Sequence, residues 1–409
     1  MRSRLSRVMV ESAVLVSFLF AAWVVVPTFT RRPWDFETYL LAARTAEAGL
    51  NPYNPKDLEI VARRPVGMSF FYPPITIPLF RPFLHMSLPN ATIAWLAIRV
   101  VAFLILFQIW RTQFLPTVPL FLLCLSAAFA FNGSVIWDLR TGNVTTIQDL
   151  FLWLGFAAYV RGRRLLAAVG ILAGSIFKLI PAMFLVLLLL RVGDRRPSWK
   201  TVLISLLAFL IVVFAAPLLI LPWSPQLLSS LAFGGPWGMA NPSALNLINS
   251  LAVHSHGVSL PENLNILVWL YYAVTLLLVS VFALRRAWVS EDATLWVLTL
   301  TALFVLLNPR PVAYGYFLAI PAMFALVPEA LKFWRLGTVA LAISAQAVVG
   351  AFVRYEDAWM TNLAFLILLT LWLLYAYWCA RQAIGVKRQG PGIDPRPFAP
   401  RPKAGRECC

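Results

Sequence analysis

Residues 165–190 read LLAAVGILAGSIFKLIPAMFLVLLLL, an apolar run that is long enough to cross a membrane as a helix. Three residues in its middle, Gly174, Lys178 and Pro181, interrupt the run. A proline removes a helix hydrogen bond, and a lysine inside a membrane needs water or a partner. We therefore predict that the segment forms a broken pair of half-helices.

The composition of the whole chain is that of a membrane protein. Of its 409 residues, 60% are hydrophobic and 12% are charged, and the mean hydropathy is +0.78. A soluble domain has about 45 to 50% apolar and about 25% charged residues. This difference excludes an ordinary soluble enzyme and predicts an all-α polytopic membrane protein.

Apolar segments of membrane-helix length recur along the sequence, and they number eleven. If every segment crossed once, the later basic loops would lie on the outer side. The conflict disappears if 165–190 enters and leaves at the cytoplasmic face, so we expect ten full spans plus this hairpin, or twelve spans if each half crosses obliquely. The segments lie near 8–27, 88–110, 116–131, 146–160, 165–190, 200–221, 263–284, 292–307, 312–328, 335–352 and 360–381.

Basic residues set the orientation of these spans. The chain has 34 Lys and Arg against 17 Asp and Glu, a net charge of +17. Most of the excess lies in short runs such as RGRR at 161–164, as the positive-inside rule requires, so nucleic acid is not an expected partner. Both termini are predicted to be cytoplasmic. Residues 1–384 form the membrane domain, and 385–409 form a disordered basic tail that can lie on an anionic leaflet.

Four segments fall on the outer side of the cell membrane in this topology: 28–87, 132–145, 222–262 and 308–311. They hold nearly all the unusual polar residues, and loops beside a helical scaffold often carry binding and catalytic groups. We expect the first three to converge on one cavity at the outer face. The residues expected to line it are Asp35, Tyr39, Tyr72, Arg140, Asn143, Asn241 and Ser243.

The first outer segment begins with a short helix. In RRPWDFETYLLAARTAEAGLNPYNP at 31–55, Asp35 stands in the N-cap position and Gly49 is a stop signal. The helix is expected to lie along the membrane surface, where Asp35 can be simply its cap. Further on, FFYPPITIPLFRPF at 70–83 has too many prolines for a span. It is expected to dip into the interface, with Tyr72 at headgroup level.

Several motifs follow one another in a recognisable order: Asp35 followed by Tyr39, GLNPY at 49–53, FYPP at 71–74, RTGNVTTI at 140–147, RGRRLLAAVGILAGSIFKLIP at 161–181 and NPSALNLI at 241–248. Over about residues 30 to 250, the chain resembles glycosyltransferase family 87. These are GT-C-type membrane mannosyltransferases that use a polyprenyl-phosphate sugar. The resemblance implies a GT-C-type helix bundle with Asp35 as the catalytic base. It also implies a lipid-linked mannose or related sugar as donor and a glycolipid or glycan acceptor at the outer face.

Two places depart from the family's pattern. The usual Gly-Gln-x-Asn reads GNVT at 142–145, and the late segment PRPVAYGYF has Tyr314 and Tyr316 where the family often shows a histidine. These departures leave the identity of the donor and of the acceptor open.

Sugar transfer from a phosphate needs fewer groups than glycoside hydrolysis, because the leaving group is already a stable anion. One base must take the acceptor's proton, and cationic or hydrogen-bonding groups must hold the phosphate. Asp35 is the expected base, with Arg140, Arg310 and Lys178 as expected cations. Asp138 in WDLRTGN is the rival base, and its alternative role is a surface ion pair with Arg140.

Lys178 has two possible roles. It can snorkel to the inner side, or it can reach a donor phosphate, because half-helices of about 13 residues rise about 20 Å into a membrane about 30 Å thick. His254 and His256 form a weak ligand pair without a third partner nearby, so neither a metal nor another cofactor is expected. His254 can instead contact the donor phosphate or the acceptor.

Two other classes of function stay open at this point. A transporter or flippase of lipid-linked sugars would also use outer loops, broken helices and intramembrane cations. It would have ionisable residues at several mid-membrane positions, whereas the spans are expected to be nearly free of charge outside Lys178. A structural membrane subunit would transfer no sugar from any donor.

Overall fold

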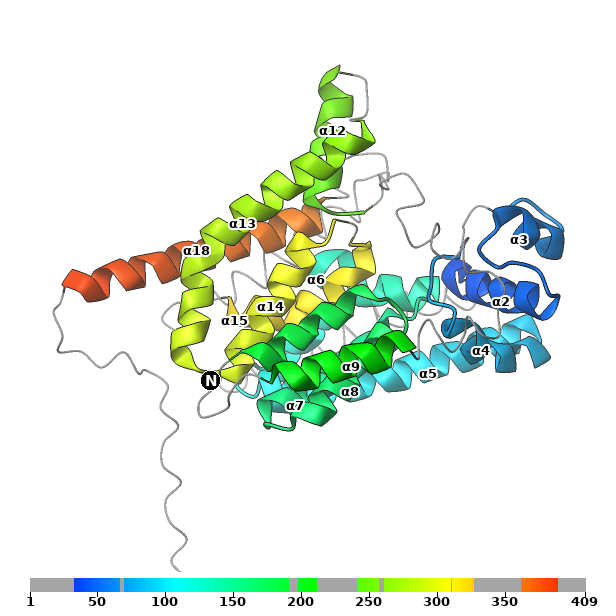
Figure 1. Ribbon diagram of the computed structural model, residues 1–409, viewed down its shortest axis with the longest axis horizontal. Coiled ribbons are helices and arrows are strands. Elements are labelled where there is room, and N and C mark those ends of the chain that lie inside the picture. The colour runs from blue at the N-terminus through cyan, green and yellow to red at the C-terminus, as the bar shows by residue number, and fades with distance from the viewer. Residues whose placement is uncertain are drawn as a thin grey trace, which may run out of the picture.

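A computed structural model describes residues 33–66, 70–190, 198–211, 241–256, 261–309, 311–326 and 362–388. Every regular element within these ranges is helical (Figure 1). This confirms the all-α membrane fold class.

The helices follow one another along the chain without long connections in most of the described ranges. Short 3-10 or π turns extend several of them. The elements are α2 (Trp34–Glu47), α3 (Pro55–Ala62), α4 (Thr76–Phe80), η1 (Arg81–His85), α5 (Leu88–Ile109), η2 (Trp110–Phe114), α6 (Leu120–Thr141), α7 (Thr145–Val160), α8 (Arg164–Ser175), η3 (Ile180–Leu189), α9 (Trp199–Leu210), α12 (Ala244–His256), α13 (Glu262–Ser290), α14 (Ala293–Leu307), η5 (Ala313–Ala319), α15 (Ile320–Ala325) and α18 (Leu363–Arg388).

Three of the described helical segments are long and apolar enough to cross a membrane, namely Leu88–Phe114, Leu264–Ser290 and Leu363–Ile384. A fourth is added if α6, which bends by 63°, counts as one span. The remaining apolar helices are shorter, between 10 and 17 residues. The expected total of ten to twelve spans stays a prediction, since the segments near 8–27 and 335–352 lie outside the described residues.

The sequence predicts an outer loop over 132–145, but most of this stretch is helical. Helix α6 continues to Thr141, and only 142–144 connect it to α7. The helix bends where Phe131 and Gly133 adopt positive φ angles of 53° and 60°. The polar residues after the bend, which suggest a loop in the sequence, are accommodated inside the protein. A second part of the expected outer loops, 244–256, is likewise helical, as α12.

The predicted break near Lys178 is present. Helix α8 ends at Ser175 and η3 begins at Ile180, so the lysine lies in the short connection between two helical pieces. The first piece packs very closely on α7, because a Cβ atom on Gly170 would come within 2.6 Å of the Gly155 backbone. The glycines therefore let the two backbones touch and fix where the connection lies.

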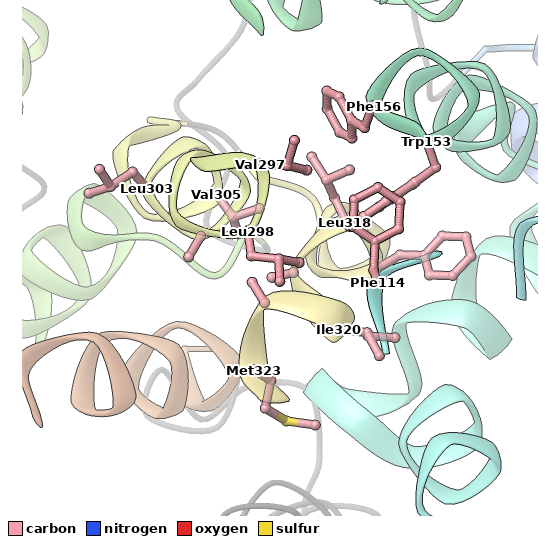
Figure 2. Packing of buried hydrophobic residues seen from close by; sticks show 14 of the residues in the cluster. Phe114, Trp153, Phe156, Val297, Leu298, Leu303, Val305, Leu318, Ile320 and Met323 are labelled. Atoms are coloured by element: carbon pink, nitrogen blue, oxygen red, sulfur yellow. The ribbon is translucent and has the colours of Figure 1, made fainter. Parts of the chain in front are cut away.

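The main hydrophobic core joins the central helices. Figure 2 shows side chains of α7, α14 and η5 pointing into one interior, with Trp153 and Phe156 of α7 at one side. The rings of Trp153 and Phe114 stand edge to face with centroids 4.7 Å apart. Many apolar residues also lie on the outside, such as Leu104 of α5 and Leu278 of α13, at 58% and 68% exposure. Lipid would cover such faces.

A smaller aromatic core holds α2 in place at one end of the molecule (Figure 1). Phe36 stacks on Trp95 of α5 at 5.6 Å, and Tyr39 stacks on Phe80 of α4 at 4.6 Å. The face of α2 that carries Tyr39 and Ala43 is thus buried against protein. The proline-rich stretch 70–83 folds as α4 and η1 beneath α2. This packing fixes the direction of the first turn of α2.

Candidate active site

Asp35 lies in the first turn of α2, and it does not cap the helix. The N-cap position belongs to Pro33, and no side chain caps this end of α2. The carboxylate of Asp35 is buried and instead accepts a hydrogen bond from Nδ2 of Asn143 at 2.9 Å. The expected N-cap position is therefore wrong by two residues, because Pro33 already begins the helix with an extended backbone. The freed carboxylate points into a polar cluster.

The turn between α6 and α7 brings Asn143 to this carboxylate. Gly142 has a φ of +81°, and a Cβ atom there would lie 2.7 Å from Cβ of Phe36 and 2.9 Å from Cβ of Pro33. Only a glycine lets the turn lie directly against the start of α2. The indole of Trp95 donates a hydrogen bond of 2.8 Å to the carbonyl of Gly142 and holds the turn from the other side.

Asn143 is the centre of the cluster and is fully buried. Besides Asp35, its Nδ2 lies 3.0 Å from the hydroxyl of Tyr72 and 2.8 Å from that of Tyr314. Its Oδ1 accepts hydrogen bonds from the backbone N–H and the hydroxyl of Thr145, at 3.1 and 2.8 Å. Both ends of the amide are thus engaged, which orients it: donors face Asp35 and the acceptor faces α7.

Lys178 reaches the same cluster from the break between α8 and η3. Its Nζ donates to the hydroxyl of Thr145 at 2.8 Å and to Oδ1 of Asn143 at 3.4 Å, and it lies 5.0 Å from the ring centre of Tyr314. Of the two expected roles, snorkelling to the inner side does not fit these contacts. The lysine instead places a positive charge near Asp35, with the side-chain amide of Asn143 bonded to both groups.

Two tyrosines from the first segment of the chain complete one wall. The hydroxyl of Tyr39 donates to that of Tyr72 at 2.8 Å. Tyr53 holds the backbone of the FYPP motif by donating to the carbonyl of Tyr72 at 2.9 Å. Tyr39 is buried, whereas Tyr72, Tyr314 and Lys178 are half-buried. The cluster is therefore closed around Asp35 and open at these three side chains.

Burial raises the pKa of the Asp35 carboxyl above its usual value. The hydrogen bond from Asn143, the nearby hydroxyls of Thr141 and Tyr314, and the attraction of Lys178 oppose the rise in pKa without cancelling it. A carboxylate with a raised pKa is a stronger base than an exposed aspartate, and it is held in one orientation. These are the properties that a general base requires.

Tyr314 is a site residue that the sequence reasoning misses. It belongs to η5, far along the chain, and its hydroxyl lies 2.8 Å from Nδ2 of Asn143, near enough to Asp35 to lower the pKa of that carboxyl. The signal is present in PRPVAYGYF, where a tyrosine stands in place of the family's histidine. In the sequence this change is only a departure from the pattern, but a phenol can hold the same place with a different hydrogen-bonding group.

The structure describes the side chains of three other expected site residues, Arg140, Asn241 and Ser243, and no hydrogen bond joins any of them to Asp35. Arg140 is half-buried, with its guanidinium 5.1 Å from the ring centre of Trp137, which packs on Trp34. Within the described structure, neither Asn241 nor Ser243 hydrogen-bonds Asp35 or Asn143. The Ser243 N–H donates to Oδ1 of Asn362 at 3.1 Å. The hydroxyl of Tyr316 donates to the carbonyl of Pro242 at 2.7 Å and ties this segment to η5, the element that also carries Tyr314. Arg310 and the side chain of His254 lie outside the described residues.

Asp138, the rival base, is enclosed in the protein. Its Oδ2 accepts hydrogen bonds from the hydroxyl and from the backbone N–H of Thr146, and the residue is fully buried. The alternative of a surface ion pair with Arg140 is thereby wrong, because Asp138 points into the helix junction. One charge besides Lys178 is buried in a helix of span length, namely Arg99 of α5.

A comparison with family models gives a match to the model named Glycosyltransferase family 87 over residues 70–309, more than half of the chain. The chain belongs to glycosyltransferase family 87. This confirms the resemblance in the motifs and assigns a membrane glycosyltransferase, with a sugar donor and an acceptor. The comparison with curated proteins gives no match. The matched region contains Tyr72, Asn143 and Lys178 but begins after Asp35, so Asp35 enters the site through its contact with Asn143.

Among the described residues, no three His, Cys, Asp or Glu side chains gather as metal ligands would.

Proposed function

We propose that this family 87 enzyme transfers a hexose, with mannose the first candidate, from a polyprenyl-phosphate sugar to a glycolipid or glycan at the outer membrane face. Asp35 is the general base of the reaction, and no metal or other cofactor takes part. The observation that carries the proposal is the buried Asp35 carboxylate, fixed by Asn143 at 2.9 Å next to a lysine.

The reaction needs one proton acceptor and one anion-binding group. The acceptor hydroxyl gives its proton to Asp35 while its oxygen attacks the anomeric carbon of the donor. The bond between this carbon and the phosphate oxygen breaks, and polyprenyl phosphate leaves with the bonding electrons. Since the phosphate is a stable leaving group, it does not need a second carboxylic acid to protonate it.

Lys178 is the residue best placed to hold the donor phosphate. Its ammonium group has three N–H donors, and two of them are engaged with Thr145 and Asn143. The third can bind a phosphate oxygen at the half-buried side of the cluster. The same two bonds keep the ammonium group close to Asp35, with Asn143 between the two. The donor phosphate and the acceptor hydroxyl would therefore meet between Lys178 and Asp35.

The remaining candidates would contact more distant parts of the substrates. Tyr39 and Tyr72 form the wall beside Asp35. Arg140, Asn241, Ser243, His254 and Arg310 are proposed to surround the rest of the lipid-linked sugar and the acceptor. In the proposed topology both termini are cytoplasmic, the site faces outward, and membrane lipid surrounds the bundle.

The proposal is tested with the purified full-length protein in lipid nanodiscs. The enzyme is supplied with a membrane lipid extract and radiolabelled mannose on either polyprenyl phosphate or a nucleoside diphosphate. We expect labelled glycolipid or glycan from the polyprenyl-phosphate donor alone. Transfer from the nucleotide sugar alone would overturn the donor assignment, and the absence of transfer from any lipid-linked sugar would overturn the function. A vesicle assay in which the lipid-linked sugar changes leaflet without being consumed would indicate a flippase instead.

A further inference from the structure

An arginine, an aspartate and a threonine are buried where α5, α6 and α7 meet. Arg99 of α5 donates from Nη1 to the carbonyl of Asp138 at 2.7 Å and from Nη2 to the carbonyl of Leu139 at 3.1 Å. Asp138, in the last turn of α6, accepts hydrogen bonds from the hydroxyl and the N–H of Thr146 in the first turn of α7. Three helices are therefore joined by these side chains, and we call Arg99, Asp138 and Thr146 the turn brace.

The turn brace acts on both helix ends that flank the site turn. The last carbonyls of a helix and its first N–H groups have no partner within the helix. Arg99 supplies a positive charge to the carbonyl end of α6, and Asp138 supplies a negative charge to the N–H end of α7. Both charges have the sign that the helix dipoles favour. The brace thus sets the distance and the angle between α6 and α7.

The turn that the brace spans is the one that carries Asn143. A direct chain of contacts joins the two: the hydroxyl of Thr141 donates to the Asp138 carbonyl at 3.2 Å and accepts from the Asn143 N–H at 3.2 Å. On the other side, Thr145, next to Thr146, binds both Asn143 and Lys178. A shift of α7 against α6 would therefore move the amide away from Asp35.

The brace is a poor device for stability alone. Arg99 lies within a helix long enough to span a membrane, where a buried charge is costly. In the described structure, Oδ1 of Asp138 and Nε of Arg99 are buried without a hydrogen-bond partner. Buried charges that are only partly satisfied often contribute less to stability than apolar residues of similar size. The hydrogen bonds of the turn brace, by contrast, hold α5, α6 and α7 in one arrangement.

We propose that Arg99, Asp138 and Thr146 are positioning residues that hold Asn143 in register between Asp35 and Lys178 for sugar transfer, an inference that rests on the proposed function. None of the three contacts the substrates. They act through Asn143, whose hydrogen bond both orients the Asp35 carboxylate and lowers its pKa against the effect of burial. The brace therefore affects the rate of transfer and its pH dependence together.

The test compares two isosteric substitutions in the full-length enzyme. Thr146→Val removes the hydroxyl from the brace, and Thr301→Val removes a buried hydroxyl that bonds the carbonyl of Leu298 in α14, at 3.0 Å. We expect Thr146→Val to lower kcat by about 10- to 100-fold, because a displacement of about 1 Å can cost about 10²-fold in rate. The acidic limb of its pH profile should move to higher pH. Thr301→Val should lower Tm by about as much as Thr146→Val does, but it should leave kcat and the pH profile unchanged. Thr146→Ser, which keeps the hydroxyl, should restore both.

A double-mutant cycle shows whether the brace acts through Asn143. In an Asn143→Ala background, Thr146→Val should cause no further loss of kcat, because the group that it positions is already gone. The inference is overturned if the two losses multiply, or if Thr146→Val behaves as Thr301→Val does. If the wild-type enzyme transfers no lipid-linked sugar, the proposed function itself fails. If the wild type is active but Thr146→Val and Thr301→Val have the same kcat and pH profile, the positioning role of the turn brace alone is overturned.

Discussion

Single side chains at this site each contact several others, so their roles can be separated by removing one group at a time. The clearest case is Tyr314, whose hydroxyl lies 2.8 Å from Nδ2 of Asn143, beside Asp35, while its ring centre lies 5.0 Å from Nζ of Lys178. Tyr316, two residues later, points elsewhere and donates to the carbonyl of Pro242 at 2.7 Å. The two tyrosines therefore form a natural pair, one beside the base and one structural.

Tyr314→Phe should move the acidic limb of kcat/KM to higher pH. The Tyr314 hydroxyl lowers the pKa of Asp35, so removing it raises this pKa further above the usual value. The base acts only when deprotonated, and the acidic limb reports the pKa of the free enzyme's base. The measurement is the pH profile of the wild type, Tyr314→Phe and Tyr316→Phe. We expect the Tyr316→Phe limb to match the wild type, and equal limbs in all three would show that Tyr314 does not act on Asp35.

At the scale of elements, the short turn between α6 and α7 organises the site. It touches the start of α2 through Gly142, which has a φ of +81°. Gly49, which ends the helical region of α2, has a similar φ of +73°, but a Cβ atom on Gly49 would have no neighbour within 4 Å. The same substitution at the two glycines separates backbone strain from contact with the site.

Gly142→Ala should abolish most of the activity, whereas Gly49→Ala should not. In both variants an alanine in the left-handed region costs about 1 kcal/mol, so both should lose a few degrees of Tm. At Gly142 the added methyl group also overlaps Phe36 and Pro33, which forces the turn and Asn143 away from Asp35. Transfer rates and Tm values of both variants check this. Equal activity in the two would mean that the turn is not held against α2 as described.

The elements of this chain are easier to predict from its sequence than their contacts. Apolar length and Pro181 are enough to place the break near Lys178, because both act locally. The resemblance selects Asp35 and Asn143, but only the fold brings them within 2.9 Å. Asp138 looks solvated in the sequence, whereas its carboxylate accepts hydrogen bonds inside the helix junction. Arg99 stands out as a charge inside the apolar segment 88–110, but the sequence does not show its partners, which are about 40 residues away.

At the scale of the whole molecule, the proposed function requires the site to face outward. Helix α3 lies in the same predicted outer segment as Asp35, and Lys56 is an exposed position on it. The basic tail is predicted on the opposite side of the membrane, following the positive-inside rule.

The predicted orientation is tested in intact cells with a membrane-impermeant thiol reagent. In a background without the four native cysteines, Lys56→Cys should be labelled, and Gly390→Cys should be labelled only after the cells are permeabilised. The reverse pattern would place the site in the cytoplasm and would require a different donor pool.

The most direct measurement of the central claim is the transfer rate of Asp35→Asn beside Glu47→Gln, an exposed carboxylate at the far end of α2. Loss of the base should lower kcat by about 10² to 10⁴, with Glu47→Gln near the wild-type rate. The stability of Asp35→Asn should not fall together with its activity. Because the folded-state pKa of Asp35 is raised, its favourable contribution is present below the unfolded pKa and is lost as pH rises through the folded pKa. At neutral pH the asparagine variant should thus keep or raise Tm. An Asp35→Asn enzyme that transfers sugar at near the wild-type rate would contradict the account.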